Sequence, residues 1–190
     1  MLKTTFIKLL AVTAIFGASC GAQASLLNGE SLSFTYLFPD QASIMAEEGD
    51  RVVGAGVEFN FYDMFFVDIA DTHITINNFF ESDSETSFDT SSFNGFVIRD
   101  INAAVNFTSV TVNSISNMLG LDASRINFDA HNIYVNWQGL SFNSNTRIQF
   151  NLEGTSHALS TVPESNSLAL FVFGLLALSL RHRAARNLKA

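Results

Sequence analysis

Apolar and polar residues alternate with a period of two through most of the middle of the chain. In residues 31–40, Leu32, Phe34, Tyr36 and Phe38 fall on one face of an extended segment. The same alternation recurs at 57–61, 74–76, 110–112, 126–128, 133–137, 140–142 and 148–152. A period of two is typical of β-strands with one buried face.

Short polar stretches separate these segments. Ala130–Asn132 and Asn143–Asn145 are expected turns, and the alternation loses phase at Gly139, which indicates a bulge or a tight turn. The pattern predicts an all-β fold, an antiparallel β-sandwich of jelly-roll type, over residues 25–154. One short helix is expected at 114–119.

Aromatic residues dominate the predicted core. The chain has 19 phenylalanines, mostly on one face of these strands, and the plain expectation is that they fill the space between two sheets. Trp137 and Tyr134 are separated by an odd number of residues, so they lie on opposite faces of one strand. Tyr134 is the better candidate for a solvent-facing aromatic residue, and hence for a contact to sugar.

The first 24 residues have the pattern of a secretory signal peptide. Lys3 and Lys8 precede an apolar stretch, and small residues lead to an expected cut between Ala24 and Ser25. The alternative is a lipoprotein signal ending before Cys20. With the cut at Ala24, the chain's single cysteine leaves with the signal, and the mature protein has no internal disulfide.

The last residues combine three features in order. Residues 155–166 form a polar linker that contains Val162, Pro163 and Glu164, and residues 167–190 hold an apolar stretch, 168–180, expected to be helical. A basic end follows directly. Basic residues flank the cytoplasmic end of membrane segments, so the pattern predicts an inner-membrane-anchored precursor with its body exported. The basic residues of this stop are Arg181, Arg183 and Arg186.

This three-part unit resembles the PEP-CTERM sorting signals of Gram-negative bacteria, although Ser165 stands where that family usually has a second proline. The resemblance implies that an exosortase-type membrane enzyme cleaves near the motif. It also implies that the body, after transient residence in the inner membrane, reaches the cell surface or the extracellular matrix. The same C-terminal pattern is sometimes labelled an ice-binding protein C-terminal domain, which describes the tail alone. The alternative is a plain single-pass anchor.

The body also resembles small secreted proteins of unassigned function that carry this sorting signal. The stretches that carry the resemblance are "FNGFVIRDIN" and "LDASRINFDAHNIYVNWQGLSF". It implies a shared fold and transfers no catalytic residue.

The body is strongly acidic. All 18 acidic residues lie within 25–164, together with four arginines and no lysine. Such a surface repels nucleic acid and attracts divalent cations. Alternating carboxylates favour one calcium ion, the only cofactor that the sequence suggests. The expected calcium ligands are Glu81, Asp83, Glu85 and Asp89; a similar group comprises Asp40, Glu47, Glu48 and Asp50.

Other metal chemistry is not favoured by the sequence. Asp68, Asp71 and His73 form one cluster and Asp129 and His131 another, but neither has the spacing of a zinc site. These residues are expected at polar strand edges. The threonines do not form the regular array that ice binding requires.

No catalytic motif is present. The body has no Gly-x-Ser-x-Gly, no Gly-rich phosphate loop and no histidine placed for a triad, so we expect a non-enzymatic protein. The sequence favours a secreted structural or adhesive component of the envelope or of an exopolysaccharide matrix. The alternatives are a carbohydrate-binding module that uses Tyr134 and a secreted hydrolase with an unrecognised site.

Overall fold

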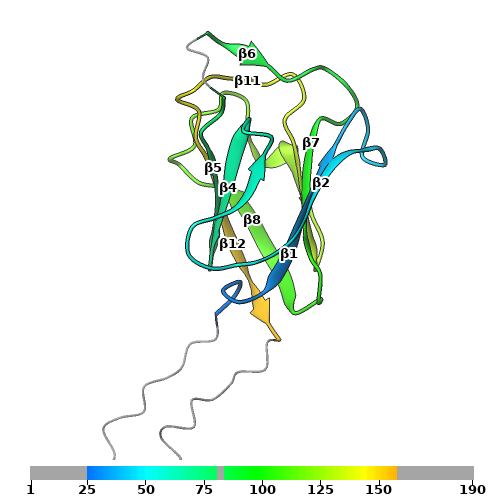
Figure 1. Cartoon of the computed structure of the whole chain (residues 1–190), viewed down its shortest axis with the longest axis vertical. Helices are drawn as coiled ribbons and strands as arrows, with labels where there is room; N and C mark the ends of the chain where they lie inside the picture. The colour runs from blue at the N-terminus through cyan, green and yellow to red at the C-terminus, as the bar shows by residue number, and fades with distance from the viewer. Residues whose placement is uncertain (1–24, 81–83, 158–190) are drawn as a thin grey trace, which may run out of the picture. The chain divides into compact units, whose positions relative to one another are not determined.

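The computed structural model describes residues 25–80 and 84–157, and in these ranges the chain is all-β with antiparallel strands (Figure 1). The one helical element there is η1 (Ala123–Arg125), a short 3-10 turn. No helix in the described ranges is long and apolar enough to cross a membrane. The expected signal helix and C-terminal hydrophobic helix, within 1–24 and 167–190, lie outside the described residues.

Ten of the described strands form two five-stranded sheets. The β1 sheet has the order β2-β1-β7-β10-β9 and consists of β1 (Ser31–Leu37), β2 (Ile44–Val52), β7 (Gly95–Asp100), β9 (Ile126–Phe128) and β10 (Asn132–Asn136). The β12 sheet has the order β3-β4-β5-β12-β8 and consists of β3 (Val57–Phe61), β4 (Phe65–Ala70), β5 (His73–Asn77), β8 (Val105–Val112) and β12 (Ile148–Ser156). A two-stranded ribbon pairs β6 (Thr86–Ser87) with β11 (Ser141–Phe142).

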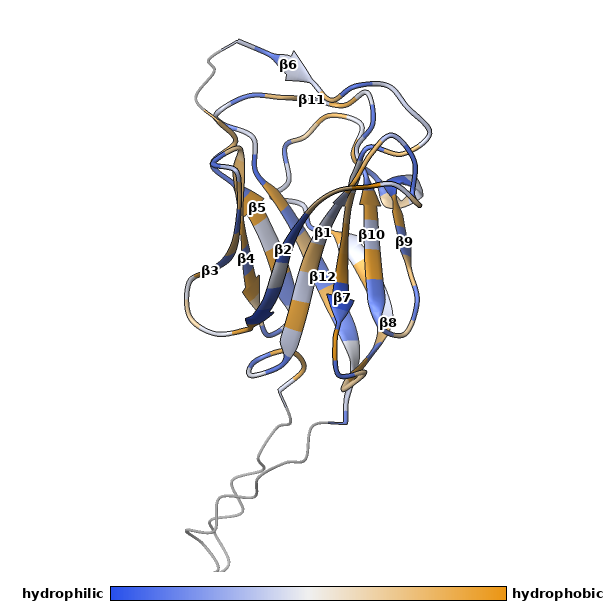
Figure 2. Ribbon diagram, turned by 45° about the vertical axis from the view of Figure 1, so that its right-hand side comes forward, coloured by the Kyte–Doolittle hydropathy of each residue, from blue (hydrophilic) through white to orange (hydrophobic). Residues whose placement is uncertain are grey.

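The two large sheets lie face to face (Figure 2), and buried apolar side chains from both sheets form one core cluster. Phe34 on β1 is fully buried between them. Its ring centroid lies 5.7 Å from that of Phe59 and 5.8 Å from that of Phe61, both on the opposite sheet, and 5.2 Å from that of Phe96 on its own sheet. These rings connect the two layers directly, so the predicted phenylalanine core is confirmed.

The alternation predicts most inward positions correctly and fails at sheet edges. Val57 is 53% exposed because the β3–β4 register shifts between Val57 and Phe59. Phe128 is 37% exposed because β9 is a short edge strand. An edge strand has a neighbour on one side only, and its outermost side chains therefore reach solvent.

The expected helix at 114–119 is wrong. This segment forms turns and bonds to the chain near the start of β12: the Asn117 amide donates to the Arg147 carbonyl at 3.0 Å, and the Gln149 amide donates to Ser116 Oγ at 2.9 Å. These bonds tie the segment to a distant part of the chain. The helical turn forms slightly later, at η1, where the Ser124 amide donates to Asp122 Oδ1 at 2.8 Å.

The expected turns and the placement of Trp137 are confirmed. Gly139 has a φ of 68°, and the Leu140 amide donates to the Trp137 carbonyl at 2.9 Å, which closes a tight turn. Trp137 is fully buried, whereas Tyr134 is half-buried on the opposite face.

The chain enters and leaves the described body at one end. The segment before β1 and the last residues of β12 lie at this end, and β6 and β11 cover the other (Figure 1). The His157 amide donates to the Ala104 carbonyl at 2.6 Å, so the body continues past the expected boundary at 154.

Replacing Phe34 with alanine removes the ring that touches both sheets. We expect Phe34→Ala to lower the free energy of unfolding by about 3–5 kcal/mol, since the surrounding rings cannot close the cavity. Phe128→Ala is the matched control on an edge strand and should cost less than about 1 kcal/mol. Urea denaturation of both variants measures the difference, and equal losses would contradict the two-layer core.

Candidate functional site

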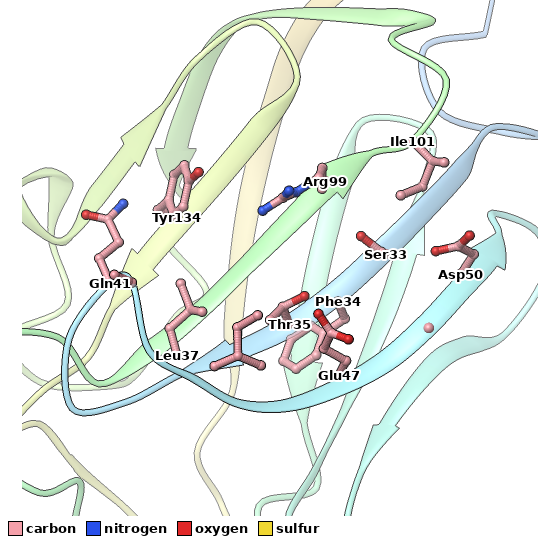
Figure 3. Close-up of a pocket in the computed structure, with 13 residues that line it drawn as sticks. Ser33, Phe34, Thr35, Leu37, Gln41, Glu47, Asp50, Arg99, Ile101 and Tyr134 are labelled. Atoms are coloured by element: carbon pink, nitrogen blue, oxygen red, sulfur yellow. The ribbon is translucent and has the colours of Figure 1, made fainter.

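A groove of about 680 Å³ crosses the outer face of the β1 sheet (Figure 3). Its polar lining comes from β1, β2, β7, β10 and the β1–β2 turn. The polar and aromatic side chains of this lining are Ser33, Thr35, Gln41, Glu47, Asp50, Arg99 and Tyr134.

The strand register places the side chains that come from strands in two rows. Asp50 pairs with Ser33, Ser33 with Arg99, and Arg99 with Asn132, which gives one row across four strands. At the usual spacing of neighbouring strands, this row is about 14 Å long. The second row is Glu47, Thr35, Val97 and Tyr134. Tyr134 and Arg99 are therefore diagonal neighbours on one surface (Figure 3).

A β-bulge brings both carboxylates into the groove. Glu47 and Asp50 are an odd number of residues apart and would face opposite sides of a regular strand. The β1–β2 register shifts between Ser33 and Thr35, and Gly49 has a φ of 72°. The extra residue returns Asp50 to the face of Glu47. Gly49 is the one local signal for this arrangement in the sequence.

The Tyr134 ring is held on an apolar base. It packs against a small cluster on the outer face of the sheet, formed by Leu37, Phe93 and Val97. Tyr134 is half-buried, so part of it is exposed at the groove. The expectation of a solvent-facing tyrosine is confirmed in that sense.

The β1–β2 turn forms one wall of the groove and carries Gln41. Asp40 holds this turn, since its Oδ1 accepts hydrogen bonds from the amides of Ala42 and Ser43, both at 2.9 Å. Hydrogen bonds from Ser43 and from the Ala42 amide hold the pKa of Asp40 below its ordinary value. Asp40, which the sequence grouped with Glu47 and Asp50, is thus a turn residue.

Arg99 is the cationic residue of the groove. Its guanidinium has no ion-pair or hydrogen-bond partner among the residues that the structure describes. Five donors therefore point into solvent beside two carboxylates and an aromatic ring. Such a mixture of an aromatic face with planar donors and acceptors suits a polyhydroxylated ligand, because ring C–H groups pack on tyrosine while hydroxyls bond to the polar groups.

The expected calcium ligands are only partly described. Glu85 and Asp89 flank β6 and are exposed, whereas Glu81 and Asp83 lie outside the described residues. Within 25–80 and 84–157, no group of three or more His, Cys, Asp or Glu side chains is placed to hold a metal ion. The calcium site stays a prediction.

Asp71, which the sequence grouped with Asp68 and His73, holds the first described residues of the body in place. Its Oδ1 accepts hydrogen bonds from the Ser25 hydroxyl and from the amides of Leu26 at 2.7 Å and Leu27 at 3.0 Å. Leu27 is fully buried behind this turn. Burial alone would raise the pKa of Asp71, but the hydrogen bonds outweigh it and lower the pKa.

The side chains of Asp129 and His131 also form hydrogen bonds within the fold. Asp129 Oδ1 accepts from the His131 amide at 2.8 Å and from the Asn132 amide at 2.9 Å, which closes the β9–β10 turn. These bonds hold the pKa of Asp129 below its ordinary value. His131 Nδ1 lies 2.7 Å from the Val105 carbonyl oxygen.

The residues expected to direct export lie mostly outside the described residues. Ser25 is described in its turn with Asp71, and Ala24, on the other side of the expected cut, is not. The sorting motif and the basic stop are likewise undescribed: Val162, Pro163, Glu164, Arg181, Arg183 and Arg186.

Comparison with known protein families, curated proteins and solved structures finds no match to this chain.

The hydrogen bonds to Asp71 give a pH-dependent stability. The lowered pKa means that the stabilisation is fully present above the ordinary aspartate pKa, about 3.9, and is lost as the pH falls through the folded-state value. We expect Asp71→Asn to lower the unfolding free energy by about 1–2 kcal/mol at neutral pH and by much less in acid. Thermal melts of wild type and Asp71→Asn, from neutral pH to below the ordinary aspartate pKa, measure the difference in stability.

Glu153→Gln, at an exposed position on β12, is the control and should leave the melting temperature nearly unchanged. A gap between wild type and Asp71→Asn that stays constant down to strongly acidic pH would contradict the role of the charged carboxylate.

Proposed function

We propose that this chain is an exported, non-enzymatic protein that serves as an adhesive or structural component of the cell envelope or of an exopolysaccharide matrix. We further propose that it holds polysaccharide in the groove of the β1 sheet. The observation that carries the proposal is the groove itself, in which a half-buried tyrosine, an unpaired arginine and two carboxylates share one outer sheet face.

The groove suits an extended sugar chain. Its polar row runs across the strands, and the Tyr134 ring lies one row away on the same surface. A ligand lying along the row would meet Asp50, Ser33 and Arg99 in succession.

The export part of the proposal rests on the two ends of the sequence. The signal-like residues 1–24, the Val162-Pro163-Glu164 motif and the basic residues after 180 support passage through the inner membrane and processing by an exosortase-type enzyme.

The jelly-roll variant of the predicted β-sandwich also stays a prediction.

A secreted hydrolase is the second candidate, because Glu47 and Asp50 line the same groove. Glycoside hydrolysis uses two carboxyl groups that flank the scissile bond. Here both carboxylates are exposed and come from the same strand, β2, which forms one side of the groove. That placement favours binding of hydroxyl groups over attack from two sides.

Removing the Tyr134 ring should weaken sugar binding. We expect the wild-type chain to bind members of a glycan array, and Tyr134→Ala to weaken that binding at least about tenfold, or ~1.4 kcal/mol. Tyr62→Ala is the matched control, since Tyr62 is 68% exposed outside the groove. Titration calorimetry with the best array ligand measures both variants.

Two results would overturn the binding proposal: no ligand on a broad array, or equal affinity for wild type and Tyr134→Ala. Release of reducing sugar from the bound glycan, lost in Glu47→Gln, would favour the hydrolase instead.

Processing at both ends is tested separately by intact-mass measurement of the protein from its native host. We expect a mature chain that starts at Ser25 and ends near Val162-Pro163-Glu164. An uncut chain of residues 1–190 in the cytoplasm would refute export whatever the groove binds.

A further inference from the structure

A second cavity lies at the end of the body that β6 and β11 cover (Figure 1). It has a volume of about 350 Å³ and shares no lining residue with the groove of the β1 sheet. A site here is therefore independent of the proposed sugar site.

The walls of this cavity are aromatic rings and thioethers. Phe61, Phe88 and Phe142 supply buried rings, and Met45 and Met64 supply flexible sulfur-containing side chains. Methionine side chains adapt to the shape of an apolar ligand and pack well against aromatic rings.

Two large apolar side chains at the cavity remain exposed to water. Met45 is 59% exposed and Phe80 is 38% exposed, although the rest of the described body buries most of its large apolar side chains. Leaving them in water is unfavourable, so an apolar molecule that covered both would gain binding free energy.

The two buried polar side chains of the cavity, Tyr36 and Asn94, already have hydrogen-bond partners. The Tyr36 hydroxyl donates to Asn94 Oδ1 at 2.6 Å and accepts from Trp137 Nε1 at 2.9 Å, and Asn94 Nδ2 donates to the Asp89 carbonyl at 3.1 Å. A ligand does not need to supply a partner for these buried groups. The cavity therefore selects an apolar molecule.

The size of the cavity and the charge around it restrict the kind of ligand further. The volume is at the lower end of the range for small-molecule sites, about 300–1,000 Å³, and is too small for a protein segment such as a helix. The Asp89 side chain at the cavity is exposed, and the body around it is acidic. An anionic ligand would be repelled.

We propose that this cavity binds a small aromatic molecule that is neutral or cationic. Phe61, Phe88 and Phe142 form the apolar wall behind the ligand, and Met45 and Phe80 close over it.

The chain's single tryptophan provides a local reporter of occupancy. Trp137 stacks on Phe88, with ring centroids 4.7 Å apart and planes 9° apart, and Phe88 lines the cavity. A bound aromatic dye would lie close to the indole. Energy transfer from Trp137 then reports dye bound near the indole, and variants of the cavity residues show whether that dye lies in the cavity.

The test uses N-phenyl-1-naphthylamine, a neutral aromatic dye, with the purified full-length chain. Titration should give a saturable rise in dye emission with one site per chain and a matching loss of Trp137 emission. The double variant Met45→Gln/Phe80→Gln should weaken binding at least tenfold, because both side chains close over the ligand. Both positions are solvent-exposed, so the fold should be retained, as an unchanged melting temperature would show.

Val52→Gln is the matched control, since Val52 lies on the same strand as Met45, is 64% exposed and is not part of the cavity. It should bind the dye as wild type does, and Tyr134→Ala should do the same. Absence of saturable energy transfer would overturn the proposal. Equal affinity of the double variant and wild type would also overturn it, as would equal or tighter binding of the anionic analogue anilinonaphthalene sulfonate.

Discussion

Contact between aromatic rings of the two sheets is the interaction on which the rest of this body depends. Phe34 and Tyr36 on β1 meet Phe61 and Phe65 of the opposite layer, and Trp137 reaches Phe65 at 5.3 Å between ring centroids. Large rings bury more apolar area per residue than aliphatic side chains do. A body of this size without a disulfide can therefore remain ordered, and its outer faces are free to carry polar groups.

The groove and the second cavity both follow from this core. With Leu32 and Phe34 turned inward, the alternate residues of β1, Ser33 and Thr35, are turned outward into the groove. At the end covered by β6 and β11, the aromatic packing reaches solvent and leaves the cavity lined by Phe88 and other rings. The aromatic rings of the core thus line the apolar cavity, and the outward-facing residues of β1 line the polar groove.

Strands were predictable from the sequence where large apolar residues recur at every second position. Ile74 and Ile76, like Ile148 and Phe150, alternate strictly and are fully buried in the β12 sheet. Prediction failed where the environment depends on a distant partner. A short helix was expected at 114–119, but the hydrogen bonds of this segment with Arg147 and Gln149 hold it in turns.

The candidate site was predictable only in part, for the same reason. The outward direction of Tyr134 follows from its odd separation from Trp137 on one regular strand. The convergence of Glu47 and Asp50 follows from a register shift against β1, which no pattern within β2 alone specifies. Gly49 lies at this register shift, but a glycine after two glutamates is equally typical of an ordinary loop.

The bulged, acidic β2 has one more consequence, for copies of the chain at high local concentration. β2 is the edge of its sheet, and a flat edge offers unpaired backbone groups to the next copy of the chain. Negative charges at Glu47, Glu48 and Asp50, together with the kink at Gly49, oppose such strand addition. The feature that shapes the groove also protects densely packed copies from fibril-like self-association.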